Sequence, residues 1–206
     1  MSPRAPITRF ASRYVMLPQS NIDTDQIIPA RFLKTTQKTG LGPHAFHDWR
    51  YRPDGSPTLE FPLNRPDAAG AEILVGGDNF GCGSSREHAV WALQGAGFRA
   101  VVSGRFSDIF RANALANGLL PIELVPQAMT VITDQAGAGS AAELTVDLER
   151  GTVRLPDGSE ASFSVPPFSR YCLLHGTDEM DFLMSAGPEI GAFERSHTPR
   201  ISTLAP

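Results

Sequence analysis

The chain has 206 residues, 18 lysines and arginines against 22 aspartates and glutamates, and 41% hydrophobic residues. This length suits one domain with a sizeable core, and the absence of a basic run argues against nucleic-acid binding. No stretch approaches the roughly 18 apolar residues of a membrane span, and no secretory signal pattern follows the N-terminus, so we expect a cytoplasmic protein. Two cysteines, Cys82 and Cys172, are too few for an iron–sulfur cluster, which usually takes about four thiolates.

The first predicted elements are short. Residues 7–17 alternate loosely between apolar and polar side chains, which predicts β structure that Pro18 closes. Asn21–Asp25 has the composition of a polar turn. Residues 30–34 follow a proline and are predicted to form a short helix.

Residues 35–70 are rich in glycine and proline and show no regular period. A long irregular segment within a compact domain is typical of a functional loop, and we expect this one to face the substrate or a partner. Its aromatic residues Phe46, Trp49, Tyr51 and Phe61 indicate that it packs against the rest of the domain.

The middle of the chain is the most regular part. It predicts strand, helix, strand, helix and strand at residues 72–75, 84–96, 99–102, 106–116 and 119–125. Asn117-Gly118 after the second helix is a typical helix C-cap. A β-α-β-α-β order implies parallel strands joined by right-handed crossovers.

The last quarter of the chain changes in character. Residues 143–165 contain short alternating segments between turn residues, which predicts a meander of antiparallel strands. Residues 168–194 are predicted to be helical with interruptions, and residues 195–206 to be a disordered tail. We therefore expect a single α/β domain over residues 1–206, with a mostly parallel core sheet, flanking helices and a β meander.

The glycine-rich loop Gly77–Gly83 and the residues after it lie between a predicted strand and a predicted helix, where α/β domains bind ligands. Ser84 and Glu87 form a capping-box pattern, which would place unpaired backbone N–H groups at the start of the helix. Arg86 would add a guanidinium suited to a carboxylate. Nucleotide-loop and hydrolase-elbow patterns are missing. The motif is therefore compatible with two interpretations, an ordinary helix cap and a carboxylate-binding site.

Four further residues have a simpler interpretation. His44, His47 and Asp48 are spaced as in some metal sites, but no additional ligand is evident, and we expect no metal on this chain. Cys172 lies in an apolar helical stretch and is predicted to be a core thiol.

Two blocks of sequence, Gly81–Ala89 (GCGSSREHA) and Asn21–Pro29 (NIDTDQIIP), strongly resemble the 3-isopropylmalate dehydratase (isopropylmalate isomerase) small subunits. These are the swivelling domains of the aconitase superfamily. The resemblance extends from about Ile7 to Glu194, with further matches at Asp48–Tyr51 and Gly118–Ile122. It implies a swivelling β/β/α fold for this chain.

The resemblance also implies an activity. Members of this family are hydro-lyases that interconvert 2-isopropylmalate and 3-isopropylmalate through isopropylmaleate in leucine biosynthesis. By residue match, Ser84 is the catalytic base, Ser85 and Arg86 hold substrate carboxylates, and Asp25 is a catalytic residue that supports the acid group of the other subunit. A [4Fe–4S] cluster is carried by the large subunit, none is bound by this chain, and activity requires that large subunit.

Some alternatives stay open at this point. The substrate could belong to a sister enzyme, such as citraconate hydratase or homoaconitase, because the loop at residues 35–47, expected to recognise the isopropyl group, is not diagnostic. A non-catalytic anion-binding module is an alternative of another class. Cys82 stands where aconitases proper carry an acidic residue and is not expected to be a ligand. The roles of Cys82 and His88 are not assigned.

Overall fold

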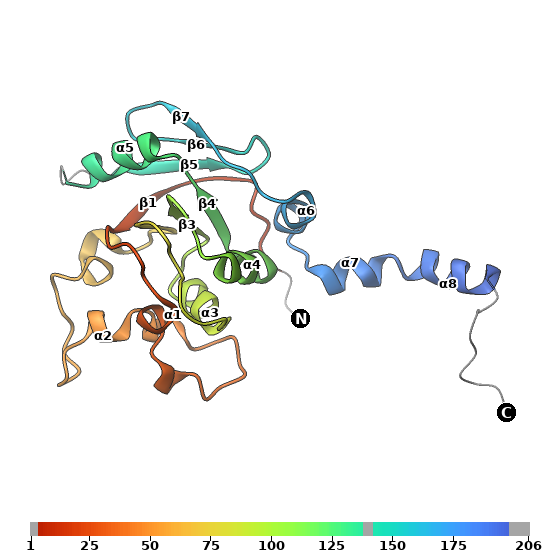
Figure 1. Cartoon of the computed structure of the whole chain (residues 1–206), viewed down its shortest axis with the longest axis horizontal. Coiled ribbons are helices and arrows are strands. Elements are labelled where there is room, and N and C mark those ends of the chain that lie inside the picture. Colours follow the sequence, from red (N-terminus) through yellow and green to blue (C-terminus); the bar gives the residue numbers. More distant parts are fainter. Residues whose placement is uncertain (1–3, 138–141, 198–206) are drawn as a thin grey trace.

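The structure, a computed structural model, describes residues 4–137 and 142–197 and contains one seven-stranded mixed sheet. In chain order its strands are β1 (Arg9–Leu17), β2 (Ile73–Gly76), β3 (Ala100–Ser103), β4 (Leu120–Glu123), β5 (Glu143–Asp147), β6 (Thr152–Arg154) and β7 (Glu160–Ser162). Their spatial order is β4-β3-β2-β1-β5-β6-β7 (Figure 1). Strands β1 to β4 pair in parallel, and β1, β5, β6 and β7 pair antiparallel.

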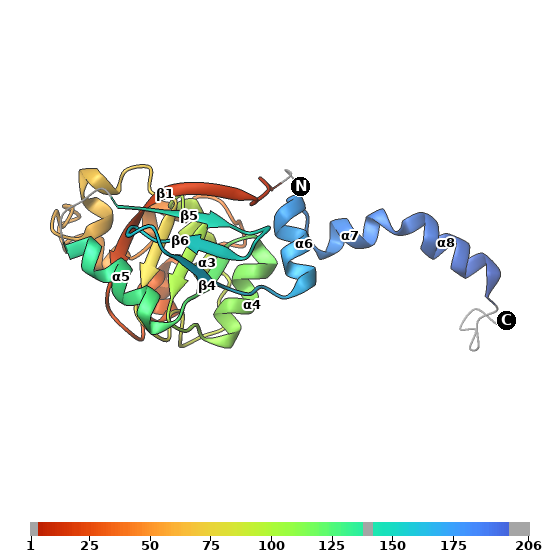
Figure 2. The same ribbon diagram turned by 90° about the horizontal axis from the view of Figure 1, so that it is seen from above.

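Helices cover both faces of the parallel strands. They are α1 (Thr24–Ile27), α2 (His47–Arg50), α3 (His88–Gly95), α4 (Asp108–Asn117), α5 (Pro126–Gly137), α6 (Pro167–His175), α7 (Glu179–Ser185) and α8 (Gly187–Ser196). Helices α1, α3 and α4 lie on one side and α5 on the other, while α7 and α8 extend away from the body (Figures 1 and 2). Within the described ranges, no helix has the length and apolar character needed to cross a membrane.

The parallel strands are buried on both faces, and alternate residues belong to two different core clusters. Leu74 and Val101 join the cluster beneath α3 and α4. Ile73, Val75 and Val102 join the cluster that includes α5 and the antiparallel strands. A strand covered on both faces needs an apolar residue at almost every position, which explains why these strands read as continuous hydrophobic runs.

Most of the predicted elements are confirmed. The β-α-β-α-β unit forms β2 to β4 with α3 and α4, and Gly118 ends α4 with a φ of 82°. The antiparallel meander forms β5 to β7. Helix α5 lies in an interval where the pattern predicted no element. Residues 195 and 196, expected in the tail, form the end of α8, and residues 198–206 lie outside the described ranges.

The predicted helix over Ser84–Ala96 starts four residues too early. Helix α3 begins at His88, and Glu87 at its N-cap makes no side-chain capping bond, so the predicted capping box is wrong. The backbone N–H of Ser84 donates instead to Thr24 Oγ1 at 3.1 Å. A tertiary contact has therefore replaced the local helix-capping bond that the sequence pattern favours.

The irregular segment at residues 35–70 packs on the core, as its aromatic residues predicted. Phe46 is fully buried, and its ring stacks on Trp49 with the centroids 5.7 Å apart. The 3₁₀ turn Gly42–His44 lies against the end of α3, where the backbones of Gly42 and Gly95 touch. Further 3₁₀ turns are Ala30–Phe32, Pro62–Asn64 and Pro66–Ala68.

The contact between Gly42 and Gly95 predicts a destabilising substitution. Alanine favours a helix more than glycine does, so Gly95→Ala alone should stabilise α3. However, its Cβ would lie 2.7 Å from the backbone N of Gly42, which has no flexible end that can yield. We expect Gly95→Ala to lower the free energy of unfolding by about 1–3 kcal/mol, as overpacked positions do. Urea unfolding measures this.

The matched control is Gly187→Ala in α8, where an added Cβ meets nothing within 4 Å. That variant should unfold at the same urea concentration as the unsubstituted chain, or slightly above it. Equal stability of the two variants would contradict the close approach of the two backbones.

Candidate active site

Two loops lie side by side where β1 and β2 end. Because β1 and β2 are parallel, their carboxyl ends reach the same edge of the sheet, and the loop after each strand begins there. The loops are joined by backbone hydrogen bonds: Asn21 N to Asp78 O at 2.8 Å, Gly81 N to Ile22 O at 2.7 Å and Thr24 N to Cys82 O at 2.9 Å. The pairing brings the two sequence blocks of the predicted site together.

Thr24 is the residue through which the two loops meet at Ser84. Its side chain is buried, with the residue 1% exposed. Thr24 Oγ1 accepts from the backbone N–H of Ser84 and lies 2.9 Å from Ser84 Oγ. Each hydroxyl has one hydrogen and two lone pairs, so either can donate in this contact, and Thr24 is able to donate to Ser84 Oγ. Sequence reasoning missed Thr24, although it directly precedes Asp25 in the block that carries the resemblance.

Asp25 and Arg86 form an ion pair across the two loops. The neighbouring Asp23 has another task, because it caps α1 by accepting from Gln26 N at 2.8 Å. The carboxylate of Asp25 is 56% exposed, so the pair is screened by water and contributes little to stability. An incoming carboxylate could therefore compete for the guanidinium of Arg86.

Ser85 completes the group of four predicted site residues. It is exposed, and its carbonyl oxygen accepts from Asn113 Nδ2 at 3.1 Å. Ser84 and Arg86 are half-buried. The structure thus brings Asp25, Ser84, Ser85 and Arg86 to one place, but on the surface rather than in a closed cavity. Their individual roles stay predictions.

The expected contribution of a helix N-terminus is absent from this loop. Since α3 begins at His88, its first N–H groups lie beyond Ser84, and the cation of this loop, Arg86, is paired with Asp25. The glycine at position 81 is explained by packing. Its φ is 75°, and an added Cβ would overlap the ring of Phe110, so packing rather than ligand access requires glycine there.

Both cysteines are free thiols, Cys82 partly exposed and Cys172 buried. Burial, together with the nearby charge of Asp23, raises the pKa of the Cys82 thiol. The thiol therefore stays neutral near pH 7, and it donates to the carbonyl of Asn21 at 3.4 Å. Cys172 is 7% exposed in α6, which confirms the predicted core thiol.

The residues His44, His47 and Asp48 take part in packing and charge pairing. The ring of His44 stacks on Phe32 with centroids 4.0 Å apart, and burial lowers the pKa of His44. Asp48 pairs with Arg31, which lowers the pKa of the Asp48 carboxyl. Across residues 4–137 and 142–197, no three histidine, cysteine or acidic side chains gather as metal ligands would.

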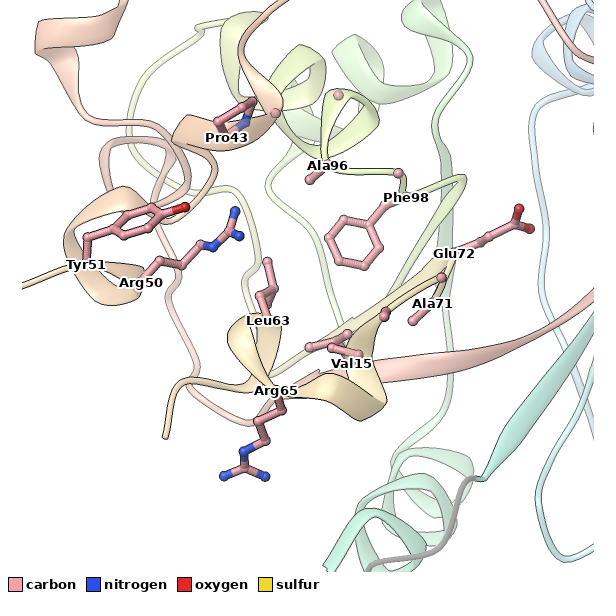
Figure 3. Close-up of a pocket in the computed structure, with 16 residues that line it drawn as sticks. Val15, Pro43, Arg50, Tyr51, Leu63, Arg65, Ala71, Glu72, Ala96 and Phe98 are labelled. Carbon is pink, nitrogen blue, oxygen red and sulfur yellow. The ribbon is translucent and has the colours of Figure 1, made fainter. Parts of the chain in front are cut away.

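A cavity of about 690 Å³ lies elsewhere, at the amino ends of the parallel strands. In Figure 3 the guanidinium of Arg50 and the hydroxyl of Tyr51 turn toward Leu63 and Phe98. Arg50 Nε donates to Asn64 Oδ1 at 3.0 Å, which holds that side chain in place. The cavity contains none of the four predicted site residues, so it is separate from the surface group at Ser84.

Comparison with known proteins gives two family matches. Residues 8–127 match the family described as the aconitase C-terminal domain, and residues 130–167 match a second family, LeuD_N. A solved structure of 3-isopropylmalate dehydratase from Methanocaldococcus jannaschii has a TM-score of 0.66 and 27% identity. The match covers 91% of this chain and 99% of that chain.

Curated relatives are more similar in sequence. The 3-isopropylmalate dehydratase small subunit of Anaeromyxobacter dehalogenans is 58% identical over 189 residues, which are 92% of this chain and 97% of that protein. The same subunit from Chloroflexus aurantiacus is 50% identical over 198 residues, 96% of this chain and 98% of that protein. The sequence similarity therefore spans almost the full length of this chain and of each relative.

The contact between Thr24 and Ser84 predicts a local effect of a substitution. Thr24→Val keeps the shape but removes the acceptor of the Ser84 N–H and the partner of Ser84 Oγ. We expect faster hydrogen exchange of the Ser84 amide and a loss of about 1–3 kcal/mol in the free energy of unfolding. Thr24→Ser retains the hydroxyl and is the control. Unchanged exchange at Ser84 in Thr24→Val would contradict the hydrogen bond.

Proposed function

This chain belongs to the family of 3-isopropylmalate dehydratase small subunits, and on that premise we propose that it provides half of the active site of a hydro-lyase. The reaction is the interconversion of 2-isopropylmalate and 3-isopropylmalate through isopropylmaleate, in the leucine pathway and in the cytoplasm. The observation that carries the proposal is the meeting of Asp25, Ser84 and Arg86 on two paired loops.

Ser84 is the proposed base. A serine hydroxyl is a weak base, and its alkoxide needs stabilisation by nearby donors. The hydroxyl of Thr24, 2.9 Å from Ser84 Oγ, is the donor that this chain offers there. During dehydration Ser84 takes the proton from one carbon of the substrate, while the hydroxyl leaves from the neighbouring carbon. The proton and hydroxyl together account for the water released.

The substrate of this reaction carries two carboxylates, and the site has groups that recognise them. Arg86 offers a forked pair of N–H donors that matches a carboxylate. Ser85 is exposed beside it and can donate its hydroxyl. Asp25 pairs with Arg86 in the free chain, so it keeps the guanidinium oriented until the substrate arrives. In the assembled enzyme Asp25 is proposed to support an acid group on the partner.

The position of the site at the surface supports a catalytic partner. Proton abstraction from carbon needs a site from which bulk water is excluded. Here Ser85 is exposed and Asp25 is largely so, and neither is covered by another part of the described chain. The relatives are named small subunits, which implies a large subunit. We propose that this large subunit closes over the two loops, with residues 35–70 at the contact or beside the substrate.

The [4Fe–4S] cluster of this reaction class is proposed to lie on the large subunit. The residues of this chain do not fit such a group. Cys172 is buried in α6, and Cys82 is a neutral thiol that already donates to a backbone carbonyl. This chain therefore contributes protein groups only, namely a base and carboxylate-binding residues.

Partner dependence is the first test of this function. The isolated chain should be colourless and should not hydrate isopropylmaleate, because it holds neither the cluster nor a closed site. The complex with the family's large subunit should be active. Activity of the isolated chain would overturn the divided site. A complex that binds the substrate but turns nothing over would favour the non-catalytic anion-binding alternative, and faster turnover of citraconate would favour the sister enzyme.

Ser84 and Ser85 should affect different kinetic constants. In the complex, Ser84→Ala removes the base and should lower kcat by about 10²–10⁴, with KM changed only a few-fold. Ser85→Ala removes a carboxylate contact and should mainly raise KM. Steady-state hydration of isopropylmaleate measures both. Wild-type kcat in Ser84→Ala would refute the assignment of the base.

A further inference from the structure

A cluster of polar side chains between α3 and α4 connects the segment Thr35–Lys38 with the segment Ser84–His88. At its centre is Asn117, the last residue of α4, which is 7% exposed. Four hydrogen bonds reach its side chain: Lys38 Nζ to Oδ1 at 3.0 Å, Trp91 Nε1 to Oδ1 at 3.0 Å, Nδ2 to Asn113 O at 2.9 Å and Nδ2 to Glu87 Oε2 at 3.4 Å. One side chain therefore joins both helices to both segments.

The hydrogen-bonding capacity of the Asn117 amide is fully used. Its oxygen accepts twice and its nitrogen donates twice, which is the most that an amide can do. Its orientation is dictated by its neighbours, because Lys38 and Trp91 only donate and the carboxylate of Glu87 only accepts. The amide thus lies between a cation and an anion, with each end facing the charge that suits it. A carboxylate could accept from Lys38 but could not donate to Glu87, and an apolar group could do neither.

On one side, Asn117 holds an otherwise irregular segment. His88 Nε2 donates to the carbonyl of Thr35 at 2.8 Å, and Lys38 reaches Asn117 while lying 5.5 Å from the centre of the Trp91 ring. In the part of the chain that the structure describes, these two hydrogen bonds are the ones that join residues 35–40 to the helices. The position of the segment therefore depends on them.

On the other side, Asn117 holds the residues that follow Ser84. Its Nδ2 reaches the carboxylate of Glu87, the N-cap of α3, which makes no capping bond of its own. Asn113, one turn earlier on α4, donates to the carbonyl of Ser85. Ser84 is fixed separately by Thr24. The stretch Ser85–Glu87 is therefore held from α4, through contacts other than the one between Thr24 and Ser84.

We propose that Asn117 is a positioning residue of the active site, which sets where Ser85 and Arg86 stand relative to the segment Thr35–Lys38. The proposal rests on the proposed function, because it assigns the effect to carboxylate binding. It follows that damage to this junction weakens substrate binding more than the chemical step, since Thr24 continues to hold Ser84.

The decisive variant is Asn117→Asp. The new carboxylate still accepts from Lys38 and Trp91, but its other oxygen faces the carboxylate of Glu87 and the carbonyl of Asn113 without a donor. In the complex we expect KM for isopropylmaleate to rise about tenfold while kcat stays within about threefold. Adding Glu87→Gln places an amide donor opposite the new carboxylate, and KM should return to within about threefold of the wild-type value. Glu87→Gln alone keeps an acceptor for Asn117 and should be close to wild type.

Hydrogen exchange of the isolated chain tests the same junction without any assay of activity. Asn117→Asp should increase exchange in residues 85–88, leave the Ser84 amide near wild type because Thr24 still holds it, and leave residues 35–40 near wild type because Lys38 keeps its acceptor. Lys38→Met should do the reverse, since it removes the hydrogen bond to Asn117 and the ammonium near the Trp91 ring while an unbranched side chain of similar length remains. Lys38 is a surface residue of a loop, so this variant tests the junction even if Asn117→Asp does not fold.

The outcomes separate the two proposals. An unsubstituted complex without turnover would refute the proposed function, whereas the exchange pattern would still decide the role of Asn117. If Asn117→Asp lowers kcat and leaves KM unchanged, or if Glu87→Gln does not restore KM, the positioning role is wrong. If both segments respond identically to Lys38→Met and Asn117→Asp, Asn117 is a general packing residue.

Discussion

The parallel pairing of β1 with β2 is the constraint on which the site depends. Parallel strands end at the same edge, so the loops that follow them begin next to each other even though about sixty residues separate their starts in the chain. Backbone hydrogen bonds then extend that pairing beyond the strands, as far as Thr24 and Cys82. Asp25 and Arg86 are therefore close enough to form an ion pair because β1 and β2 are parallel neighbours in the sheet.

Hydrophobic periodicity predicted the β2–β4 unit and the antiparallel meander, but neither helix α5 nor the start of α3. Strands buried on both faces, the Gly118 C-cap and the antiparallel meander all leave strong local patterns. The residues Ser84 to Glu87 have an equally strong local pattern for a capping box. Thr24, sixty residues earlier, offers the Ser84 amide a buried acceptor instead. A single sequence does not reveal which of two good hydrogen-bond partners is nearer in space.

The same limitation explains which site residues were found. Ser84, Ser85, Arg86 and Asp25 are polar residues in distinctive blocks, so they could be singled out by type and order. Thr24 and Asn117 act through neighbours from other parts of the chain, and nothing in their flanking residues distinguishes them from a turn threonine and a helix C-terminal asparagine. Sequence therefore predicts the groups that meet a ligand better than the groups that hold them.

The contact of Gly42 with Gly95 also limits where this family can vary in length. An added Cβ at Gly42 would overlap the carbonyl oxygen of Gly95, so an insertion there would push the segment off α3. Gly40 and Gly55 are different, because both are exposed and an added Cβ at either meets nothing within 4 Å. Insertions and deletions between homologues should therefore accumulate around Gly40 and Gly55, while the close contact at Gly42 keeps its length.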